Sequence, residues 1–177
     1  MRSSTFKKTA QYALQTLLLI CVPWLTHAED ALETKVKSAY VFHLISFVEW
    51  EQLPSDAFHV CVLGASSIGV MLTELSNRQV KNLPLKIDVN NIENHIVDCQ
   101  VLFIGKDMGN WRDILNKLHN EDVLTVSDIT DFAQHGGMIG FYDVEGKTKL
   151  ELNPTITKAA NLKISAKLME LARIVSQ

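Results

Sequence analysis

The stretch Phe58-His59-Val60-Cys61-Val62-Leu63-Gly64 decides the fold, together with a second stretch of the same kind, Asp98-Cys99-Gln100-Val101-Leu102-Phe103-Ile104-Gly105. Both are short, continuous apolar runs, and such runs predict strands that are covered on both faces of a sheet. Each run ends at a glycine and is followed by apolar residues at helical spacing. Strand–turn–helix units of this type build α/β sheets, so the sequence predicts an α/β domain.

The patterns on either side of these runs extend the prediction to the whole chain. In order, they predict a helix over 31–50, a short helix after Gly64, a half-buried strand over 80–90 near a sheet edge, a helix at 111–118, a strand at 123–126, a hairpin of strands 138–142 and 149–153, a helix starting at Pro154, and a terminal helix with an apolar stripe from Ile164 to Val175. We therefore predict a single domain with a mixed, mostly parallel sheet flanked by helices, followed by a C-terminal hairpin and a terminal helix.

The first 28 residues have the pattern of a secretory signal peptide. A basic start is followed by an apolar segment over 12–25 and by Thr26-His27-Ala28, which has small residues where a signal peptidase reads. The alternative, a membrane anchor, fits less well because this segment is shorter than the roughly 20 residues of a spanning helix. We predict export of the protein with cleavage after about Ala28, which leaves residues 29–177 as the α/β domain.

Cleavage would change both the charge and the cysteine content of the protein. The leader holds three of the 17 basic residues and none of the 20 acidic ones, so the mature net charge is about −6. This charge argues against nucleic acid or an anionic membrane as the main partner. Two cysteines remain, Cys61 and Cys99, and an even pair in an oxidising compartment favours a disulfide. The alternative is a pair of buried free thiols.

No constellation of residues in the mature chain indicates catalysis, a metal or a cofactor. Its histidines show no metal-protease spacing, and the pattern of a nucleophile elbow is absent. Ser127 and Asp128 with His135 could form part of a triad, but a strand end and a turn explain them better. Glu151 would need a partner if it faced inward, and Lys163, Lys167 or Arg173 could supply one, whereas a solvated position is the default.

Several blocks of the sequence, taken in order, resemble the YfiR family of exported regulatory proteins. The blocks are Phe47-Val48-Glu49-Trp50, Val60-Cys61-Val62-Leu63-Gly64, Cys99 to Gly105, Val123 to Asp128, Phe132, Gly136-Gly137-Met138-Ile139, Glu151-Leu152-Asn153, and Leu162 to Arg173. The resemblance covers essentially the whole mature chain. Two departures are that Glu51, and not proline, follows Trp50, and that the second cysteine pair of some members is missing.

The resemblance implies a periplasmic α/β protein, often dimeric, with no known catalytic activity. In the studied branch it implies repression of an inner-membrane diguanylate cyclase through the periplasmic sensor domain of that enzyme. An OmpA-like outer-membrane lipoprotein can sequester the repressor, and cyclic di-GMP, biofilm formation and motility respond. Cys61 and Cys99 match the core cysteine pair of the family, which supports the disulfide.

Two places in the sequence are candidates for binding. The second half of the helix over 31–50 is apolar nearly all round, so it is either an ordinary core helix or a contact surface; Val41, Ile45, Val48 and Trp50 are the candidate partner-binding residues. A small ligand would instead bind at the ends of the parallel strands, in the loops 64–67, 105–109 and 127–131. This second arrangement would make the protein a periplasmic small-ligand binder that acts on another membrane partner.

Overall fold

The computed structural model describes residues 23–64, 66–90, 92 and 94–176. Residues 34–177 form one compact unit, and the boundary before it lies inside α2, a helix over Pro23–Phe47. Most of the predicted signal peptide lies outside the described residues, and its predicted cleavage site after Ala28 falls within α2. Within the described part of the chain, no helix has both the length and the hydropathy needed to span a bilayer.

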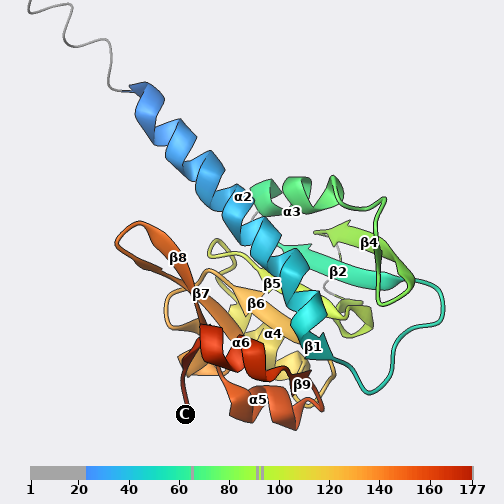
Figure 1. Cartoon of the computed structure of the whole chain (residues 1–177). Coiled ribbons are helices and arrows are strands. Elements are labelled where there is room, and N and C mark those ends of the chain that lie inside the picture. The colour runs from blue at the N-terminus through green and yellow to red at the C-terminus, as the bar shows by residue number, and fades with distance from the viewer. Residues whose placement is uncertain (1–22, 65, 91, 93, 177) are drawn as a thin grey trace, which may run out of the picture. The chain divides into compact units, whose positions relative to one another are not determined.

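The core of the compact unit is an eight-stranded mixed sheet (Figure 1). Among the described strands of this sheet, only the pairs β7–β8 and β3–β4 are antiparallel, so the sheet is mostly parallel, as predicted. A two-stranded antiparallel sheet lies beside it and pairs β1 (Val48–Glu49) with β9 (Lys163–Ile164). The spatial order of the large sheet is β10 (Arg173–Ile174), β8 (Lys147–Leu152), β7 (Ile139–Val144), β6 (Leu124–Ser127), β5 (Val101–Ile104), β2 (Phe58–Leu63), β4 (Leu83–Val89) and β3 (Gln79–Val80).

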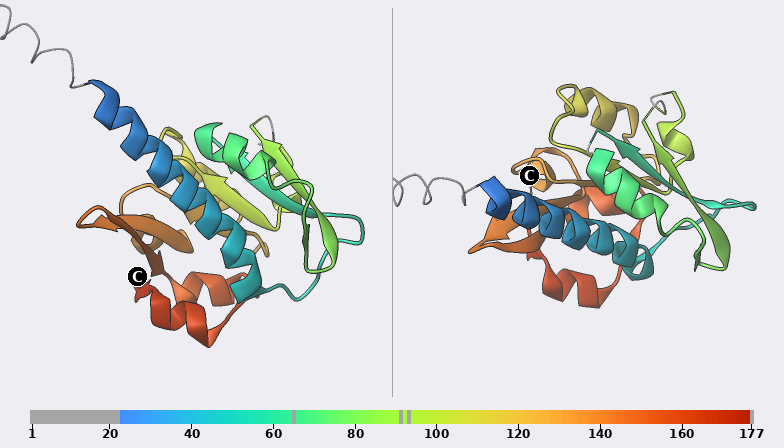
Figure 2. Two further views of the ribbon diagram at one scale, coloured as in Figure 1. Left: turned by 45° about the horizontal axis from the view of Figure 1, so that its top comes forward. Right: turned by 90° about the horizontal axis from the view of Figure 1, so that it is seen from above.

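Both faces of the central strands are covered. Along β2, Val60 and Val62 belong to one hydrophobic cluster with Val41 of α2, whereas Cys61 and Leu63 belong to a second cluster. The first cluster also takes residues from α3 (Ser66–Thr73) and α6 (Ala166–Leu171), and the second from α4 (Trp111–Lys117), η1 (Ile96–Asp98) and η2 (Phe132–His135). Figure 2 shows α2 and α4 on opposite sides of the sheet. The continuous apolar runs therefore reflect burial on two faces, as the sequence predicted.

The Cys61–Cys99 disulfide is present, and this confirms the predicted pairing over the alternative of two free thiols. The two Cα atoms are 6.0 Å apart, and both side chains are buried in the second cluster. Cys61 lies in the middle of β2, and Cys99 lies between η1 and β5, the strand that pairs with β2. The disulfide thus fastens the connection before β5 to the centre of the sheet.

Several predicted element boundaries differ from the structure. The strand predicted over 80–90 is divided by a turn at Lys81 and Asn82, so Val80 ends β3 and β4 begins at Leu83. The terminal helix begins at Ala166, because Ile164 belongs to β9. The helix predicted to reach about Trp50 ends at Phe47, because Val48 and Glu49 pair with β9 instead. The apolar stripe predicted to continue to Val175 is broken after α6, where Ala172 is extended and β10 joins the edge of β8. The backbone N–H of Val175 then donates to the Leu152 carbonyl at 2.9 Å, a hydrogen bond that a continuing helix could not make.

Candidate functional site

The four residues predicted as a contact surface lie in the core. Val41, Ile45 and Val48 are at most 2% exposed, and Trp50 is 8% exposed. The Trp50 ring packs edge-on against Phe58 at 5.1 Å, and its Nε1 donates to the Gln100 carbonyl at 3.2 Å. These residues therefore hold α2 and the segment after it onto the sheet. Their burial moves the candidate contact to the other side of α2.

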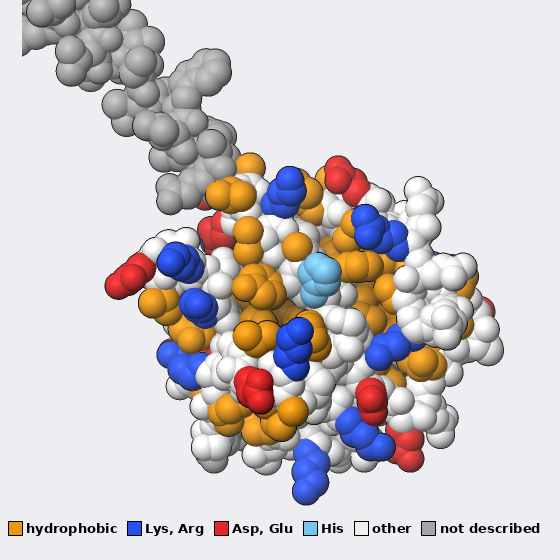
Figure 3. Space-filling model, viewed as in Figure 1, with side chains coloured by type: hydrophobic (Ala, Val, Ile, Leu, Met, Phe, Trp, Pro, Cys, Tyr) orange, Lys and Arg blue, Asp and Glu red, His pale blue; other side chains and the backbone are white. Residues whose placement is uncertain are grey.

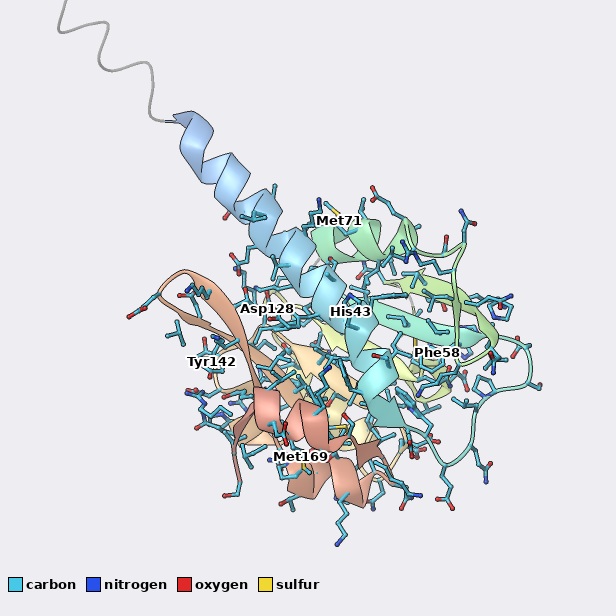
Figure 4. The ribbon with its side chains drawn as sticks, viewed as in Figure 1. His43, Phe58, Met71, Asp128, Tyr142 and Met169 are labelled. Atoms are coloured by element: carbon cyan, nitrogen blue, oxygen red, sulfur yellow. A yellow bond between two sulfur atoms is a disulfide. The ribbon has the colours of Figure 1, made fainter. Side chains whose placement is uncertain are left out.

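The other side of α2 forms what we call the α2 outer face, made of Tyr40, Phe42, His43, Ser46 and Phe47. His43 and Ser46 are exposed, and the three aromatic side chains are half-buried. Figure 3 shows hydrophobic side chains gathered on this side of the molecule around a histidine, and Figure 4, from the same viewpoint, labels His43 on α2. Large apolar patches rimmed by polar groups are typical of protein contact sites.

A groove lies on each side of His43, and each groove makes the outer face concave. One, of about 310 Å³, lies between α2, β8 and α6 and is lined by Tyr40, His43, Leu44, Phe47, Lys149, Leu150, Leu168 and Leu171. The other, of about 360 Å³, lies between α2 and β3 and is lined by Phe42, His43, Ile45, Ser46, Gln79, Val80 and Lys81. Leu171, at the rim of the first groove, is 63% exposed. Apolar side chains of a partner could therefore fill both grooves.

Basic side chains surround the aromatic residues of this region. The Arg78 guanidinium lies 5.6 Å from the centre of the Phe42 ring, and Lys167 Nζ lies 5.8 Å from that of Phe47. Lys81 Nζ lies 6.0 Å from the Trp50 ring. Among the described residues that line the two grooves, none is acidic. The α2 outer face is thus apolar with a basic rim, on a protein whose net charge is negative.

A buried ion pair attaches α2 to the end of a central strand. Lys37 Nζ lies 2.8 Å from Asp128 Oδ2, with side-chain exposures of 10% and 8%. Asp128 follows β6, and its other carboxylate oxygen accepts a hydrogen bond from the Lys106 backbone N–H at 3.1 Å. Figure 4 labels Asp128 beside α2. The position of α2 is therefore fixed at this end by charge as well as by apolar packing.

The strand-end loops suggested for a small ligand contact one another. The Gly64 backbone N–H donates to Asn90 Oδ1 at 3.0 Å, and Gly64 has a φ of +66°. Asp107 and Met108 occupy the space where a Cβ on Gly64 would lie, so only glycine permits this approach. Together with the hydrogen bond from the Lys106 backbone N–H to Asp128, these contacts hold the ends of β2, β5 and β6 close to one another.

The triad considered for Ser127, Asp128 and His135 does not form. Ser127 is fully buried, and its hydroxyl donates to the Ile104 carbonyl at 2.6 Å. Asp128 pairs with Lys37. Each of these polar groups therefore has a structural partner. Within the described residues, no cluster of three or more His, Cys, Asp or Glu side chains could hold a metal ion.

Glu151 is buried, contrary to the solvated position expected by default. It is 1% exposed, and its Oε2 lies 2.6 Å from a guanidinium nitrogen of Arg173 in β10. This hydrogen bond raises the pKa of Arg173 above its usual value. Glu151 Oε1 also accepts a hydrogen bond from the Ala133 backbone N–H at 3.3 Å, while Asn153 Nδ2 donates to the Ala133 carbonyl at 2.9 Å. Glu151 and Asn153 thus hold η2 in place through the backbone of Ala133.

A family model described as YfiR/HmsC-like matches residues 34–173. The chain belongs to this family. Family membership confirms the resemblance found in the sequence, and members of the YfiR/HmsC-like family are periplasmic regulators rather than enzymes. The family also points in general to a membrane diguanylate cyclase as partner. A search of curated proteins finds no match to the chain.

The α2 outer face is made of other residues than Val41, Ile45, Val48 and Trp50, the four candidates from the sequence. The helical period does separate Tyr40, His43 and Phe47 from the buried stripe of Val41, Ile45 and Val48, since positions three and four apart share a face. Both sides of the helix carry large hydrophobic residues, so hydrophobicity alone does not indicate which side packs against the sheet.

Proposed function

We propose that this protein is an exported regulatory protein that represses an inner-membrane diguanylate cyclase by binding the cyclase's periplasmic sensor domain. Less cyclic di-GMP would then be made, which would lower biofilm formation. Family membership supports this class of function. The observation that carries the proposal is the α2 outer face, an apolar surface with two grooves and a basic rim and without acidic lining among the described residues.

The surface favours a partner of defined chemistry. Two or more large apolar side chains would enter the grooves beside His43, and carboxylates around them would face Arg78, Lys81, Lys149 and Lys167. Buried apolar anchors supply most of the affinity in protein interfaces, and complementary charge at the rim supplies orientation and association rate. A periplasmic domain with an amphipathic, acidic-flanked helix would meet both requirements.

Repression requires the protein to distinguish two states of its partner. A ligand shifts an equilibrium only by its differential affinity, and a change from 1:99 to 99:1 needs about 10⁴-fold preference for one state. The apolar grooves and the basic rim of the α2 outer face could provide such a preference if the cyclase presents the matching surface only in its inactive state.

The proposal places the regulator in the periplasm, with Met1–Ala28 removed as a signal peptide and residues 29–177 forming the working protein. By the same resemblance, we propose that the protein forms a homodimer and that an OmpA-like outer-membrane lipoprotein sequesters it.

The first experiment measures cellular cyclic di-GMP in the native host with and without the gene. We expect the level to rise on deletion and to return when the complete reading frame is restored. A version beginning at residue 29, without the leader, should fail to restore it. An unchanged level on deletion, with the neighbouring cyclases shown to be expressed, would contradict the proposal.

A second experiment tests the surface. His43→Glu places an acidic group between the two grooves, and Lys117→Glu changes charge on α4, on the opposite side of the sheet, as the matched control. We expect His43→Glu to weaken binding of the purified cyclase sensor domain by at least about 10-fold, since like charges at an interface cost several kcal/mol. The Lys117→Glu variant should bind as the wild type does. Equal binding by both variants, with unchanged melting midpoints, would move the contact away from α2.

A further inference from the structure

A hollow of different chemistry lies between α4, η2 and α5 (Pro154–Ala159). Its volume is about 360 Å³, within the range of small-molecule sites. It reaches Thr125 at the start of β6 and Met138 just before β7, so it lies at the amino-terminal ends of these parallel strands. This is the end of the sheet opposite to the strand-end loops suggested from the sequence. We call it the α4–α5 cavity.

One face of α4 supplies an arginine to this cavity. The Arg112 guanidinium lies over the ring of Trp111, 4.1 Å from its centre, and Trp111 is itself buried against Phe132. Stacking occupies the flat face of the guanidinium and leaves the N–H groups along its edge available, which is the arrangement that binds carboxylate or phosphate in a bidentate manner. Among the described residues, no carboxylate forms an ion pair with Arg112.

Two histidines also line the cavity. His135 Nδ1 lies 2.9 Å from the Asp131 carbonyl oxygen, and because a carbonyl can only accept, Nδ1 carries the hydrogen. Its Nε2 can therefore donate to a ligand only when the ring is protonated. His119, two residues beyond the end of α4, also lines the cavity.

The rest of the lining is complementary. The amides of Asn116 and Asn120 can both donate and accept, and Leu115, Met138 and Ile156 provide an apolar wall. Among the described residues that line the cavity, none is acidic, although acidic residues outnumber basic ones in the chain. Basic groups without acidic partners, beside an apolar wall, form a site for an anion that carries an apolar body.

We propose that the α4–α5 cavity binds a small organic anion, with its carboxylate or phosphate group on Arg112 and its apolar part against Leu115, Met138 and Ile156. The cavity and the α2 outer face share no lining residue, and α2 and α4 cover opposite faces of the sheet. This inference therefore does not rest on the proposed repression of a cyclase.

The test is calorimetric titration of the protein expressed from its full reading frame and purified as the cell processes it. Phenyl phosphate and 3-phenylpropionate are the two anionic probes, and benzyl alcohol is the neutral probe with a similar body. We expect at least one anion to bind and the alcohol not to bind, and the preferred anion identifies the ligand's charged group. No binding of either anion, or equal binding of the alcohol, would overturn the proposal.

Variants test the residues. Arg112→Gln should weaken binding of the anion about 10- to 100-fold, since hydrogen bonds to charged groups contribute about 1.5–3 kcal/mol. Lys117→Gln removes the same charge from the same helix outside the cavity and should bind as the wild type does. Ala159→Phe fills the cavity from an exposed position of α5 and should abolish binding with little change in melting midpoint. Wild-type affinity in either Arg112→Gln or Ala159→Phe would refute the assignment.

Discussion

Reduction of the Cys61–Cys99 disulfide should destabilise the protein by an amount that the structure allows us to calculate. The two cysteines are 38 residues apart in the sequence. The chain-entropy relation for a closed loop of this length gives about 4 kcal/mol at 25 °C. Most domains of this size are stable by about 5–15 kcal/mol, so the disulfide would account for a large share of the total. For a chain of 150–250 residues, this loss corresponds to a fall in melting midpoint of about 8–16 °C.

The assay is urea unfolding of oxidised and reduced protein, followed by tryptophan fluorescence. Trp50 and Trp111 are both buried, and they belong to different hydrophobic clusters on the two faces of the sheet. A single transition therefore reports that both faces unfold together, which a two-state free energy requires. The control is the double variant Cys61→Ala, Cys99→Ala, whose midpoint should not respond to the reductant.

A difference of less than about 1 kcal/mol between the unfolding free energies of oxidised and reduced protein would refute this prediction. Such a result would mean that the two buried sulfurs stabilise the fold by packing in their cluster and that the cross-link adds little. If the reductant also lowers the stability of the double alanine variant, the loss of stability comes from the reductant itself and not from the disulfide.

Two ion pairs give further predictions. Arg173→Met leaves the buried Glu151 carboxylate without its cation and should lower the free energy of urea unfolding by about 1–3 kcal/mol. This loss is below the range for a fully buried pair because Arg173 is 46% exposed. Adding Glu151→Gln should recover part of the loss, and an unchanged stability of Arg173→Met alone would contradict the pairing. Lys37→Met should cost about 3 kcal/mol, because both side chains of the Lys37–Asp128 pair are nearly buried, and Asp128→Asn in the same chain should restore stability if the uncompensated carboxylate is the cause.

The sequence predicted best those elements whose environment is decided locally. The run from Phe58 to Leu63 is a strand with these limits, because a continuous apolar run between polar residues and a glycine has few other stable forms. Asn153-Pro154 begins a helix as predicted, and the Asn153 side chain accepts hydrogen bonds from the backbone N–H groups of Thr155 and Ile156.

Predictions that depended on distant residues were weaker. The periodicity from Ile164 to Val175 fits a helix, but the open edge of β8 pairs with β10 and draws the chain out of helical form after Leu171. Nothing in the sequence around Glu151 shows that Arg173 will lie beside it. In both cases the deciding contact is made between segments about 20 residues apart, which local patterns do not specify.

The segment from α5 to α6 connects the α4–α5 cavity to the α2 outer face. Ile156 and Ala159 of α5 line the α4–α5 cavity. The chain continues from there through β9, which pairs with β1 directly after α2, to α6, which lines a groove of the α2 outer face. An anion that shifts α5 would therefore act on the groove through β9 and α6. Linkage requires that the factor by which the anion changes partner affinity equals the factor by which the partner changes anion affinity.

Ala159→Phe separates the two functions: it should remove any effect of the anion on partner binding while partner binding itself persists. Loss of partner binding in this variant, with its fold intact, would instead place the cavity in the contact surface.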